Sequence, residues 1–351
     1  MAAAENGTAT AATSSENNHS PRSILAAVDP SEESSYAFNW YLDNIARPED
    51  KVTTLSVEEV SDFSFFLKPE DIDELENQRR EEVQKLLANF SEKAKEKGVT
   101  TVSETAAGDA RQIIIEKAEK DGYELLVMGS RGLGAIKRTF LGSVSDYCLH
   151  QASCPTLVVR KKALDGVPKQ ADGPRKVAVA VDDSEGSAYS FDWALKNVAR
   201  PGDLVLAIHI RSPAYLRYPV AEMGMGEYYM PPDVIADMEK SSAEQAEQLV
   251  RKFVKRAVHE YKMKCEGYVF RGDARELLVE ETEKLGAAVL VMGSRGLGAI
   301  SRTILGSVSD YCAHHCPCPV LVVKQPKTDV SATLKKEEEG AKKEEEEKKQ
   351  E

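Results

Sequence analysis

Two similar series of apolar runs and amphipathic segments follow one another along the chain. In the first series, "SILAAV" at 23–28 and "KVTTLSV" at 51–57 are short and apolar, as buried strands are. A longer segment beyond them has apolar residues at helical spacing, namely Val83, Leu86, Leu87, Phe90 and Ala94. The pattern therefore predicts strands that alternate with helices, and a long helix that packs along a single apolar face.

The second series repeats this order with closely related residues. "VAVAV" at 177–181 and "LVLAIHI" at 204–210 predict the strands, and the apolar face of the long helix is formed by Leu249, Val250, Phe253, Val254 and Ala257. Each series then has the sequence "GDAR", whose aspartates, Asp109 and Asp273, are expected to cap the next helix. Those helices precede the apolar runs "LLVMG" and "VLVMG", which predict strands buried on both faces.

The two series indicate a duplication. Residues 125–160 and 289–324 are identical at 27 of 36 positions, with a constant offset of 164. Nearer the start of each copy the offset is 153, because "VDPSEESSYAFNW" begins at 28 and "VDDSEGSAYSFDW" at 181, so the second copy carries 11 extra residues. We expect these within the Tyr-, Met- and Pro-rich stretch at 212–232. A period of this length is too long for a solenoid and indicates tandem domains.

Alternating strands and helices in each copy indicate an α/β fold, with a parallel sheet covered by helices on both faces. We place the first domain at 22–161, a Gly- and Pro-containing linker at 162–174 and the second domain at 175–325. Residues 1–21 are expected to form a disordered tail, and 326–351 a highly charged one. In such sheets, ligands bind beyond the carboxyl ends of the strands.

Composition narrows the functional classes. The 351 residues are 42% hydrophobic and 30% charged, as in ordinary globular proteins, and the formal net charge is -12. An acidic chain of this kind is not expected to bind nucleic acid, and no apolar run reaches the ~18 residues of a membrane helix. Residues 1–20 lack the apolar core of a secretory signal, so we expect a cytoplasmic protein that does not associate with membranes.

Six cysteines without a secretory signal argue against a disulfide framework. Three of them stand in "CAHHCPC" at 312–318, which has the residue types of a zinc site. The first copy, "CLHQASC" at 148–154, lacks two of those potential ligands, so buried thiols near a strand are the favoured interpretation. We therefore assign neither a metal ligand nor a catalytic residue from these segments.

The most informative stretch is the loop after each doubly buried strand. It reads Gly129-x2-Gly132-x9-Gly142-Ser143, and the second copy has the same spacing 164 residues later. Glycines let a ligand approach the backbone closely, and Ser143 is expected to cap a helix that begins at Val144. The N–H groups and the positive dipole end of that helix suit a phosphate. Further positive charge comes from Arg131, Lys137 and Arg138.

A plainer interpretation of the same residues stays open. Ser143-x-x-Asp146 and its copy resemble a capping box, which any helix start can carry. However, twelve residues separate Gly129 from Gly142, whereas a plain turn needs ~2–6. The retained glycines and basic residues are more than a cap requires, which favours phosphate binding.

Two aspartates and the absence of two common phosphate-binding motifs further define the predicted site. Asp29 and Asp182 follow the first strand of each copy, where a carboxylate can bond a ribose or an adenine amine, or cap the next helix. The loop matches neither the P-loop nor the dinucleotide pattern, because Ala135 and Lys137 stand where those motifs need lysine and glycine. Without a P-loop lysine, the standard apparatus of phosphoryl transfer is not expected.

Together these residues resemble the universal stress protein family, whose ATP-binding members carry the same spaced glycines followed by Ser or Thr. The resemblance covers roughly 21–161 and 174–325, and it implies an open five-stranded parallel sheet of order 3-2-1-4-5 in each domain, as in the adenine nucleotide alpha-hydrolase-like fold. It also implies ATP or a related adenine nucleotide, in many members with Mg2+. Family dimers pair through the last strand, so the two domains are expected to form an intramolecular pseudo-dimer, and a further homodimer is left open.

The resemblance also implies the nucleotide-binding residues, position by position. In the first domain these are Asp29 and Val57 on the adenosine side, and in the loop Met128, Gly129, Arg131, Gly132, Gly142, Ser143 and Val144. In the second domain they are Asp182 and Ile210, and in the loop Met292, Gly293, Arg295, Gly296, Gly306, Ser307 and Val308. Ile210 departs from the valine of the family, but it is apolar and is expected to pack against adenine.

Three functions fit these features. The favoured one is a soluble stress-response protein that acts by binding ATP in each domain, because a phosphate cradle is predicted without a paired general base and metal-holding acid. A slow ATPase would use Asp29 and Asp182, the only acids that are placed to hold a metal near the phosphates. A scaffold would keep the nucleotide as a structural element and recruit partners through 212–232 and the charged tails.

Overall fold

The computed structural model describes residues 21–58, 69–132, 141–161, 173–213, 231–296 and 305–325. Nearly all of the predicted tails and linker, and most of the stretch at 212–232, lie outside these ranges.

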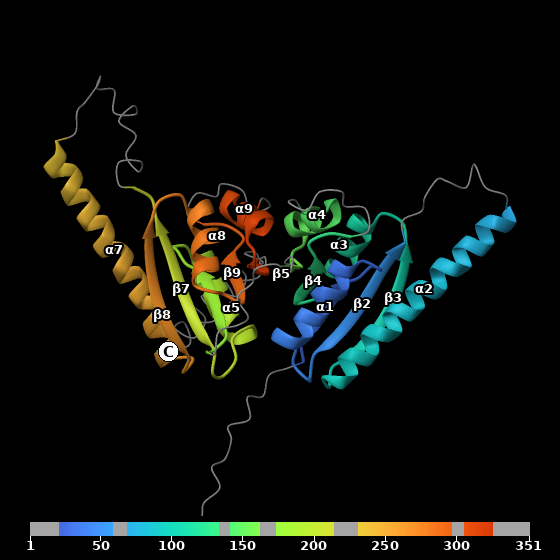
Figure 1. Ribbon diagram of the computed structural model, residues 1–351. Coiled ribbons are helices and arrows are strands. Elements are labelled where there is room, and N and C mark those ends of the chain that lie inside the picture. Colours follow the sequence, from blue (N-terminus) through green and yellow to red (C-terminus); the bar gives the residue numbers. More distant parts are fainter. Residues whose placement is uncertain are drawn as a thin grey trace, which may run out of the picture.

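Strands and helices alternate throughout, as the hydrophobic pattern predicts (Figure 1). The first repeat consists of β1 (Ser23–Ala27), α1 (Glu32–Asn44), β2 (Lys51–Glu58), α2 (Pro69–Glu96), β3 (Thr100–Ala107), α3 (Ala110–Lys120), β4 (Leu125–Gly129), α4 (Ser143–Gln151) and β5 (Thr156–Val159). The second repeat consists of β6 (Lys176–Ala180), α5 (Glu185–Asn197), β7 (Leu204–Arg211), α7 (Pro232–His259), β8 (Lys264–Arg271), α8 (Ala274–Lys284), β9 (Val289–Gly293), α9 (Ser307–His315) and β10 (Val320–Val323).

The two repeats share one ten-stranded sheet of order β3-β2-β1-β4-β5-β10-β9-β6-β7-β8. Within each repeat the strands are parallel and follow the predicted order 3-2-1-4-5, which confirms the predicted fold class. The repeats join where β5 and β10 pair antiparallel, with Leu157 opposite Leu321. The expected pairing through the last strand is therefore present within one chain, and the two predicted sheets form a single one.

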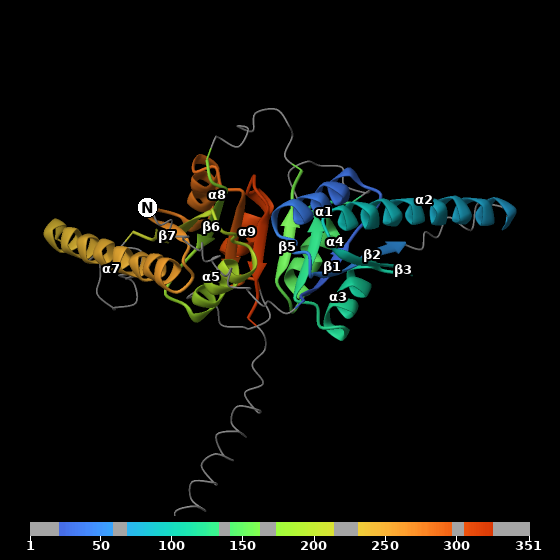
Figure 2. The same cartoon turned by 90° about the horizontal axis from the view of Figure 1, so that it is seen from below.

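Helices cover both faces of the sheet, and each face has its own hydrophobic core. On β4, Leu125 and Val127 face the core formed with α1 and α2, whereas Leu126 and Met128 face the core formed with α3 and α4. Each core extends through both repeats, because it also contains the equivalent residues of β9. The two longest helices, α2 and α7, lie along the outer flanks of the molecule (Figure 2). The prediction that these central strands are buried on both faces is confirmed.

Most of the predicted insertion lies between β7 and α7. That interval runs from 212 to 231, whereas the interval between β2 and α2 runs from 59 to 68, so it accounts for ten of the eleven extra residues. The eleventh lies between α7 and β8. There Lys262 adopts a φ of 57° at the position that Gly98, with a φ of 75°, occupies in the first repeat.

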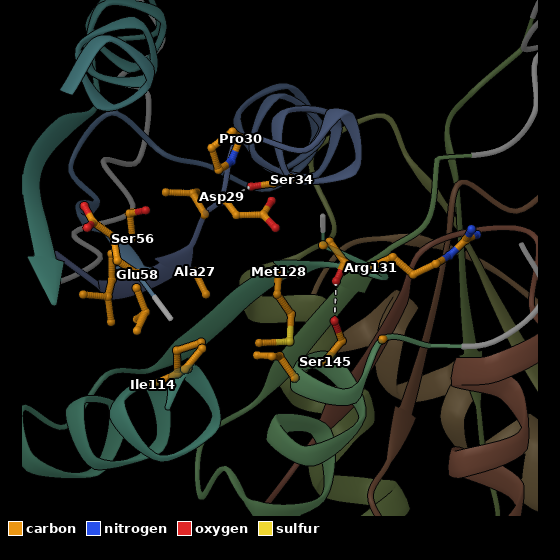
Figure 3. Close-up of a pocket in the computed structure, with 18 of the residues that line it drawn as sticks. Ala27, Asp29, Pro30, Ser34, Ser56, Glu58, Ile114, Met128, Arg131 and Ser145 are labelled. Atoms are coloured by element: carbon orange, nitrogen blue, oxygen red, sulfur yellow. Dashed lines mark hydrogen bonds between the residues drawn. The ribbon is translucent and has the colours of Figure 1, made fainter. Parts of the chain in front are cut away.

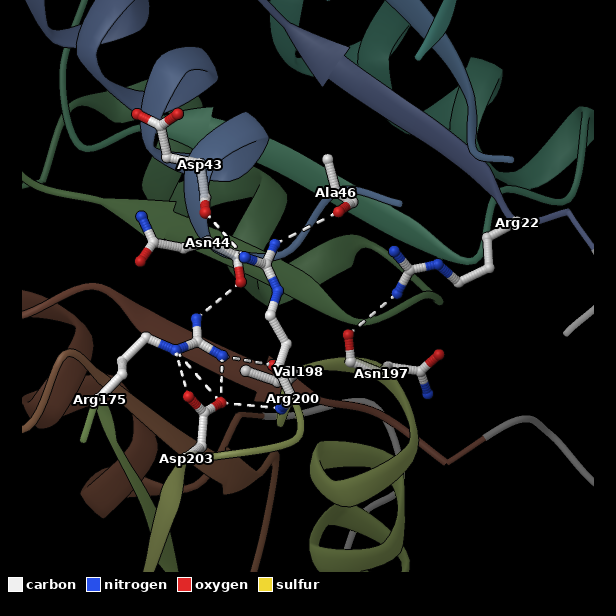
Figure 4. A network of polar contacts seen from close by, with 9 residues as sticks. All are labelled: Arg22, Asp43, Asn44, Ala46, Arg175, Asn197, Val198, Arg200 and Asp203. Atoms are coloured by element: carbon white, nitrogen blue, oxygen red, sulfur yellow. Dashed lines mark hydrogen bonds and ion pairs between the residues drawn. The ribbon is translucent and has the colours of Figure 1, made fainter. Parts of the chain in front are cut away.

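Two ion pairs, Arg22–Asp50 and Arg175–Asp203, anchor the starts of β1 and β6. Both arginines also reach across to the other repeat (Figure 4). Arg22 donates to both carboxylate oxygens of Asp50, at 2.8 and 2.6 Å, and to the carbonyl of Asn197 in the other repeat at 3.1 Å. Arg175 makes the equivalent pair with Asp203, at 2.5 Å, and donates to the carbonyl of Asn44 at 2.6 Å. Each arginine therefore binds a helix end of the other repeat.

Candidate functional site

Sheet topology brings the predicted site residues of each repeat together. Because β1 and β4 are parallel neighbours, with Ala27 opposite Met128, Asp29 and Gly129 leave the sheet at the same carboxyl edge. The start of α4 returns to this edge, since Ser145 Oγ donates to the carbonyl of Gly129 at 2.8 Å.

A cavity of about 690 Å³ lies at this edge in the first repeat (Figure 3). One part of its lining is apolar and comes from β1, β2, α3 and β4, namely Ala27, Val57, Ala110, Ile114 and Met128. Another part is formed by Asp29 and the glycine loop, namely Gly129, Arg131, Gly132, Gly142, Ser143 and Val144. Every residue predicted for the first site thus lines a single cavity.

Asp29 links the end of β1 to the start of α1. Its Oδ1 accepts hydrogen bonds from the N–H of Ser31 at 3.1 Å and from the Ser31 hydroxyl at 2.5 Å. Ser31, and not Asp29, caps α1, because its hydroxyl accepts from the N–H of Ser34 at 3.1 Å. Of the two roles left open for Asp29, the direct capping role is therefore taken by Ser31, while the carboxylate still faces the cavity.

Gly132 lies directly against the Asp29 carboxylate. A Cβ added at Gly132 would come closer than 3.0 Å to Asp29 Oδ2, a separation that real Cβ atoms essentially never show. The loop closes beside it, where the N–H of Gly142 donates to the carbonyl of Ser130 at 2.8 Å. A side chain at Gly132 would therefore require the carboxylate of Asp29 to move.

The start of α4 carries no side-chain cap. The helix begins at Ser143 with Gly142 as its N-cap, so the prediction that Ser143 caps a helix beginning at Val144 is wrong by one residue. Gly142 is extended, with φ -71° and ψ 153°, and its carbonyl already accepts the first helical hydrogen bond, from Asp146. The capping-box interpretation is wrong for the same reason. The N–H groups at the first turn consequently have no acceptor within the helix.

Over the residues it describes, the structure does not place the charged groups of the basic loop residues in the cavity. The backbone of Arg131 lines the cavity, but its side chain extends away from the other cavity residues (Figure 3). Near it, burial and the charge of Arg131 lower the pKa of Arg160. Lys137 and Arg138 lie outside the residues that the structure describes.

The second repeat reproduces these contacts closely. Asp182 Oδ1 accepts from the N–H and hydroxyl of Ser184, at 3.0 and 2.5 Å, and a Cβ added at Gly296 would again meet the carboxylate closer than 3.0 Å. Gly306 is the N-cap of α9 without a side-chain cap, and Ser309 donates to the carbonyl of Gly293 at 2.8 Å. The duplicated sequence therefore forms two equivalent arrangements.

The two sites differ on the side of the second strand. Where the first cavity is lined by Ser56 and Glu58, the second repeat has His209 and Arg211. His209 is 7% exposed and its Nδ1 lies 2.7 Å from the carbonyl oxygen of Val181, so it is a satisfied buried residue, as expected. Arg211 forms an ion pair with Glu239 of α7 at 2.6 Å.

Two residues that line the first cavity, Ser34 and Ile114, were not singled out from the sequence. Ser34 accepts a hydrogen bond from the N–H of Asp29 at 3.0 Å, and Ser187 repeats this contact with Asp182 at 2.8 Å. Their identity in both copies was the available signal. Ile114, one turn into α3, contributes to the apolar lining, but helical periodicity alone marks it only as a core residue.

The six cysteines are all thiols in the structure. Cys316 and Cys318 lie close together, with their sulfurs 3.3 Å apart, and Cys316 also contacts the hydroxyl of Thr282 at 3.5 Å. The hydrogen bond from Cys318 lowers the pKa of Cys316 to about 7. Cys312 is fully buried, which agrees with the interpretation of small buried thiols near a strand.

Comparison with known proteins now decides the family. The model of the universal stress protein family matches residues 21–160 and 173–324, well over half of the chain. The chain belongs to the universal stress protein family. Both matches coincide with the repeats, so the protein contains two tandem domains of this family.

Individual relatives agree with this assignment. Universal stress protein PHOS34 of Arabidopsis thaliana is 39% identical over 171 residues, which are 44% of this chain and 64% of that protein, so the match spans just under two thirds of the relative. A universal stress protein of Mycolicibacterium smegmatis is 27% identical over 86% of this chain and 96% of its own length. The crystal structure of a universal stress protein from Archaeoglobus fulgidus shares the fold, with a TM-score of 0.60 at 23% identity over 88% of this chain and 98% of that one.

The described helices also bear on membrane association. Among them, none combines the length and apolar character that crossing a bilayer requires.

Proposed function

We propose that each repeat binds ATP or a related adenine nucleotide at the carboxyl edge of its strands, and that the protein regulates other processes through this binding. The observation that carries the proposal is the uncapped start of α4 beside Asp29, on one cavity with an apolar wall. Backbone N–H groups and the helix dipole favour a phosphate, whereas the apolar wall suits a base.

The size and chemistry of the cavity support a nucleotide. A volume of about 690 Å³ falls within the range of ~300–1,000 Å³ that is usual for small-molecule sites. Because Gly132 has no Cβ, the Asp29 carboxylate lies directly against its backbone, and both can contact one ligand. The residues present thus fit the nucleotide that the family resemblance implies, and Mg2+ would accompany its phosphates.

Binding is favoured over rapid turnover because the loop has no P-loop lysine. Six cysteines that are all thiols suit a reducing compartment, so we place this function in the cytoplasm.

Calorimetric titration with ATP in the presence of Mg2+ tests the proposal. The intact protein is expected to bind at two sites, and Asp29→Asn and Asp182→Asn are each expected to weaken one of them about tenfold or more, because each loses a charged hydrogen-bond acceptor. Asp43→Asn is the matched control, since Asp43 pairs with Lys97 at the exposed end of α1. Affinity that is unchanged in both site variants would contradict the proposed binding mode.

A further inference from the structure

The helices α4 and α9 face one another across the midline of the molecule (Figure 1). Four titratable side chains of these helices lie close together there. Each helix carries an aspartate in its first turn and a histidine four residues later: Asp146 and His150 on α4, Asp310 and His314 on α9. We call these four residues the interface cluster. They lie outside the nucleotide cavity and are half-buried.

Each imidazole of the interface cluster is held by its own helix. Nδ1 of His150 lies 2.9 Å from the carbonyl oxygen of Asp146, and Nδ1 of His314 lies 2.9 Å from that of Asp310. A carbonyl oxygen can only accept, so Nδ1 carries the proton in both rings. In the neutral ring the lone pair is then on Nε2. Backbone anchoring of one nitrogen is also how proteins orient metal-binding histidines.

Both Nε2 atoms approach a carboxylate of the other repeat. His314 Nε2 lies 3.4 Å from Asp146 Oδ1, and His150 Nε2 lies 3.5 Å from Asp310 Oδ1. These separations exceed the ~2.7–3.2 Å of ordinary N–H···O hydrogen bonds. They match the distance of about 3.3–3.5 Å between two ligand atoms on a tetrahedral Zn²⁺ ion, given bond lengths of about 2.0–2.1 Å.

One set of three donors is already gathered. Ligand atoms of Asp146, Asp310 and His314 all lie within 4.8 Å of one another. Among the described residues, this is the one group of three His, Cys, Asp or Glu side chains that is close enough to hold a metal ion together. The nearby cations Lys324 and Arg160 donate instead to main-chain carbonyls, at His150 and His314 respectively. The two carboxylates therefore meet across the interface with imidazole nitrogens between them.

We propose that the interface cluster binds one divalent transition-metal ion of the Zn²⁺ type through Asp146, Asp310 and His314. Two carboxylates and an imidazole suit such ions, and the partly exposed position leaves room for water as a further ligand. His150 lies beside Asp310 and can replace the water. Because the ligands come from both repeats, the ion would join α4 to α9 and stabilise the pairing of the two domains.

The thiols of Cys316 and Cys318 are the competing site nearest in sequence. Their sulfurs contact each other, and that of Cys316 also contacts Thr282, whereas His314 of the same segment faces the other repeat. The "CAHHCPC" segment thus contributes a histidine to the interface cluster without its cysteines. Soft thiolates and N/O donors give cobalt complexes with different spectra, which separates the two possibilities.

The test is calorimetric titration of the full, chelator-stripped and nucleotide-free chain with Zn²⁺. We expect one ion per chain, and binding weakened by more than about tenfold in Asp146→Asn, Asp310→Asn and His314→Ala. The control is His315→Ala. His315 is the next residue on α9, is exposed, and has its Nδ1 2.8 Å from the carbonyl oxygen of Tyr311, so it matches His314 except in facing away from the cluster.

Cobalt spectroscopy and thermal melting complete the test. Binding to the interface cluster predicts a Co²⁺ spectrum without a thiolate charge-transfer band and a melting temperature raised by Zn²⁺ in the intact protein and in His315→Ala. Circular dichroism checks that the asparagine variants fold. The proposal is overturned by an absence of Zn²⁺ binding, by binding that survives Asp146→Asn and Asp310→Asn, or by a thiolate band that places the ion at the cysteines.

Discussion

The contact between Gly132 and Asp29 leaves less room for a larger residue than other contacts described for the first site. A methyl group at Gly132 would displace the carboxylate, because Oδ2 occupies the space that a Cβ needs. We predict that Gly132→Ala weakens nucleotide binding at the first site about ten- to a hundredfold, the equivalent of ~1–3 kcal/mol of overpacking. Gly296→Ala is expected to do the same at the second site only.

A control for the added methyl group is available in α5. At Gly186 a Cβ would meet its nearest atoms at 3.5 Å or more, which is ordinary contact, so Gly186→Ala should leave the first site unaffected. Titration of each variant with a fluorescent adenine nucleotide measures the effect. Equal affinity in Gly132→Ala and the intact protein would show that the carboxylate does not need its present position.

At the residue scale, the sequence predicts what local chemistry determines. The spaced glycines mark the close approach to Asp29, and the same spacing in both copies indicates two such loops. The direction of the Arg131 side chain, away from the other cavity residues, was not predictable because it depends on tertiary packing. The partners of Asp146 were missed for the same reason: from the sequence it resembles a capping residue, and only the fold places it opposite His314.

At the scale of single elements, α4 is joined to the other repeat at its last turn. Lys324, after β10, donates to the carbonyls of His150 and Ala152 at 3.0 and 2.5 Å. Burial lowers the pKa of Lys324 from 10.5 to about 8. Between these two values the unfolded chain binds the proton and the folded chain does not, so this residue makes the protein more stable as pH rises from about 8 toward 10.5.

Urea unfolding at several pH values measures this effect. The difference in unfolding free energy between the intact protein and Lys324→Met removes the contributions of other groups. We predict that this difference shifts in favour of the intact protein as pH rises through the window above about 8. A difference that stays constant from pH 7.5 to 9.5 would show that Lys324 has an ordinary pKa.

The elements themselves follow from periodicity and capping chemistry. The apolar face of α2 is buried at Val83, Leu87, Phe90 and Ala94, as predicted, and Asp109 caps α3 by accepting from the N–H of Arg111. The start of α4 differs by one residue because Gly142 takes an extended conformation and needs no side chain to begin the helix. Helix starts are predicted from residues whose side chains cap the helix, such as serine. A start at which no side chain forms the cap, as at Gly142, is therefore misplaced by such a prediction.

At the scale of the whole molecule, we predict that the two repeats unfold as one cooperative unit. They share a sheet and both cores, and Arg22, which is paired with Asp50, joins them by donating to the carbonyl of Asn197. Asp50 is fully buried, so Arg22→Met leaves its carboxylate without the charged partner. We predict a loss of about 3–5 kcal/mol in unfolding free energy. Lys97→Met, which breaks an exposed pair with Asp43, should cost about 1 kcal/mol or less.

One tryptophan in each repeat reports on this cooperativity. Trp40 of α1 and Trp193 of α5 both pack against the core shared by the repeats. In Trp40→Phe and Trp193→Phe variants, the remaining tryptophan should show the same urea midpoint, and Arg22→Met should lower both midpoints together. Two separate midpoints in the intact protein would mean that the repeats unfold independently.

The joining of the repeats could be predicted only in part. Pairing through the last strand followed from the resemblance to the family, and β5 and β10 confirm it. The exchange of arginines could not be predicted, because Arg22 and Asn197 are 175 residues apart and neither lies in a recognisable motif.

Native mass spectrometry of the purified chain, equilibrated with ATP and Mg2+, tests the central claim most directly, because it reports the identity and number of bound nucleotides together. At an ATP concentration that just saturates the intact protein, the account predicts two adenine nucleotides on each chain, and the loss of most of one of them in Asp29→Asn or Asp182→Asn. A chain that carries no adenine nucleotide at saturating ATP, or that loses none in the double variant, would contradict it.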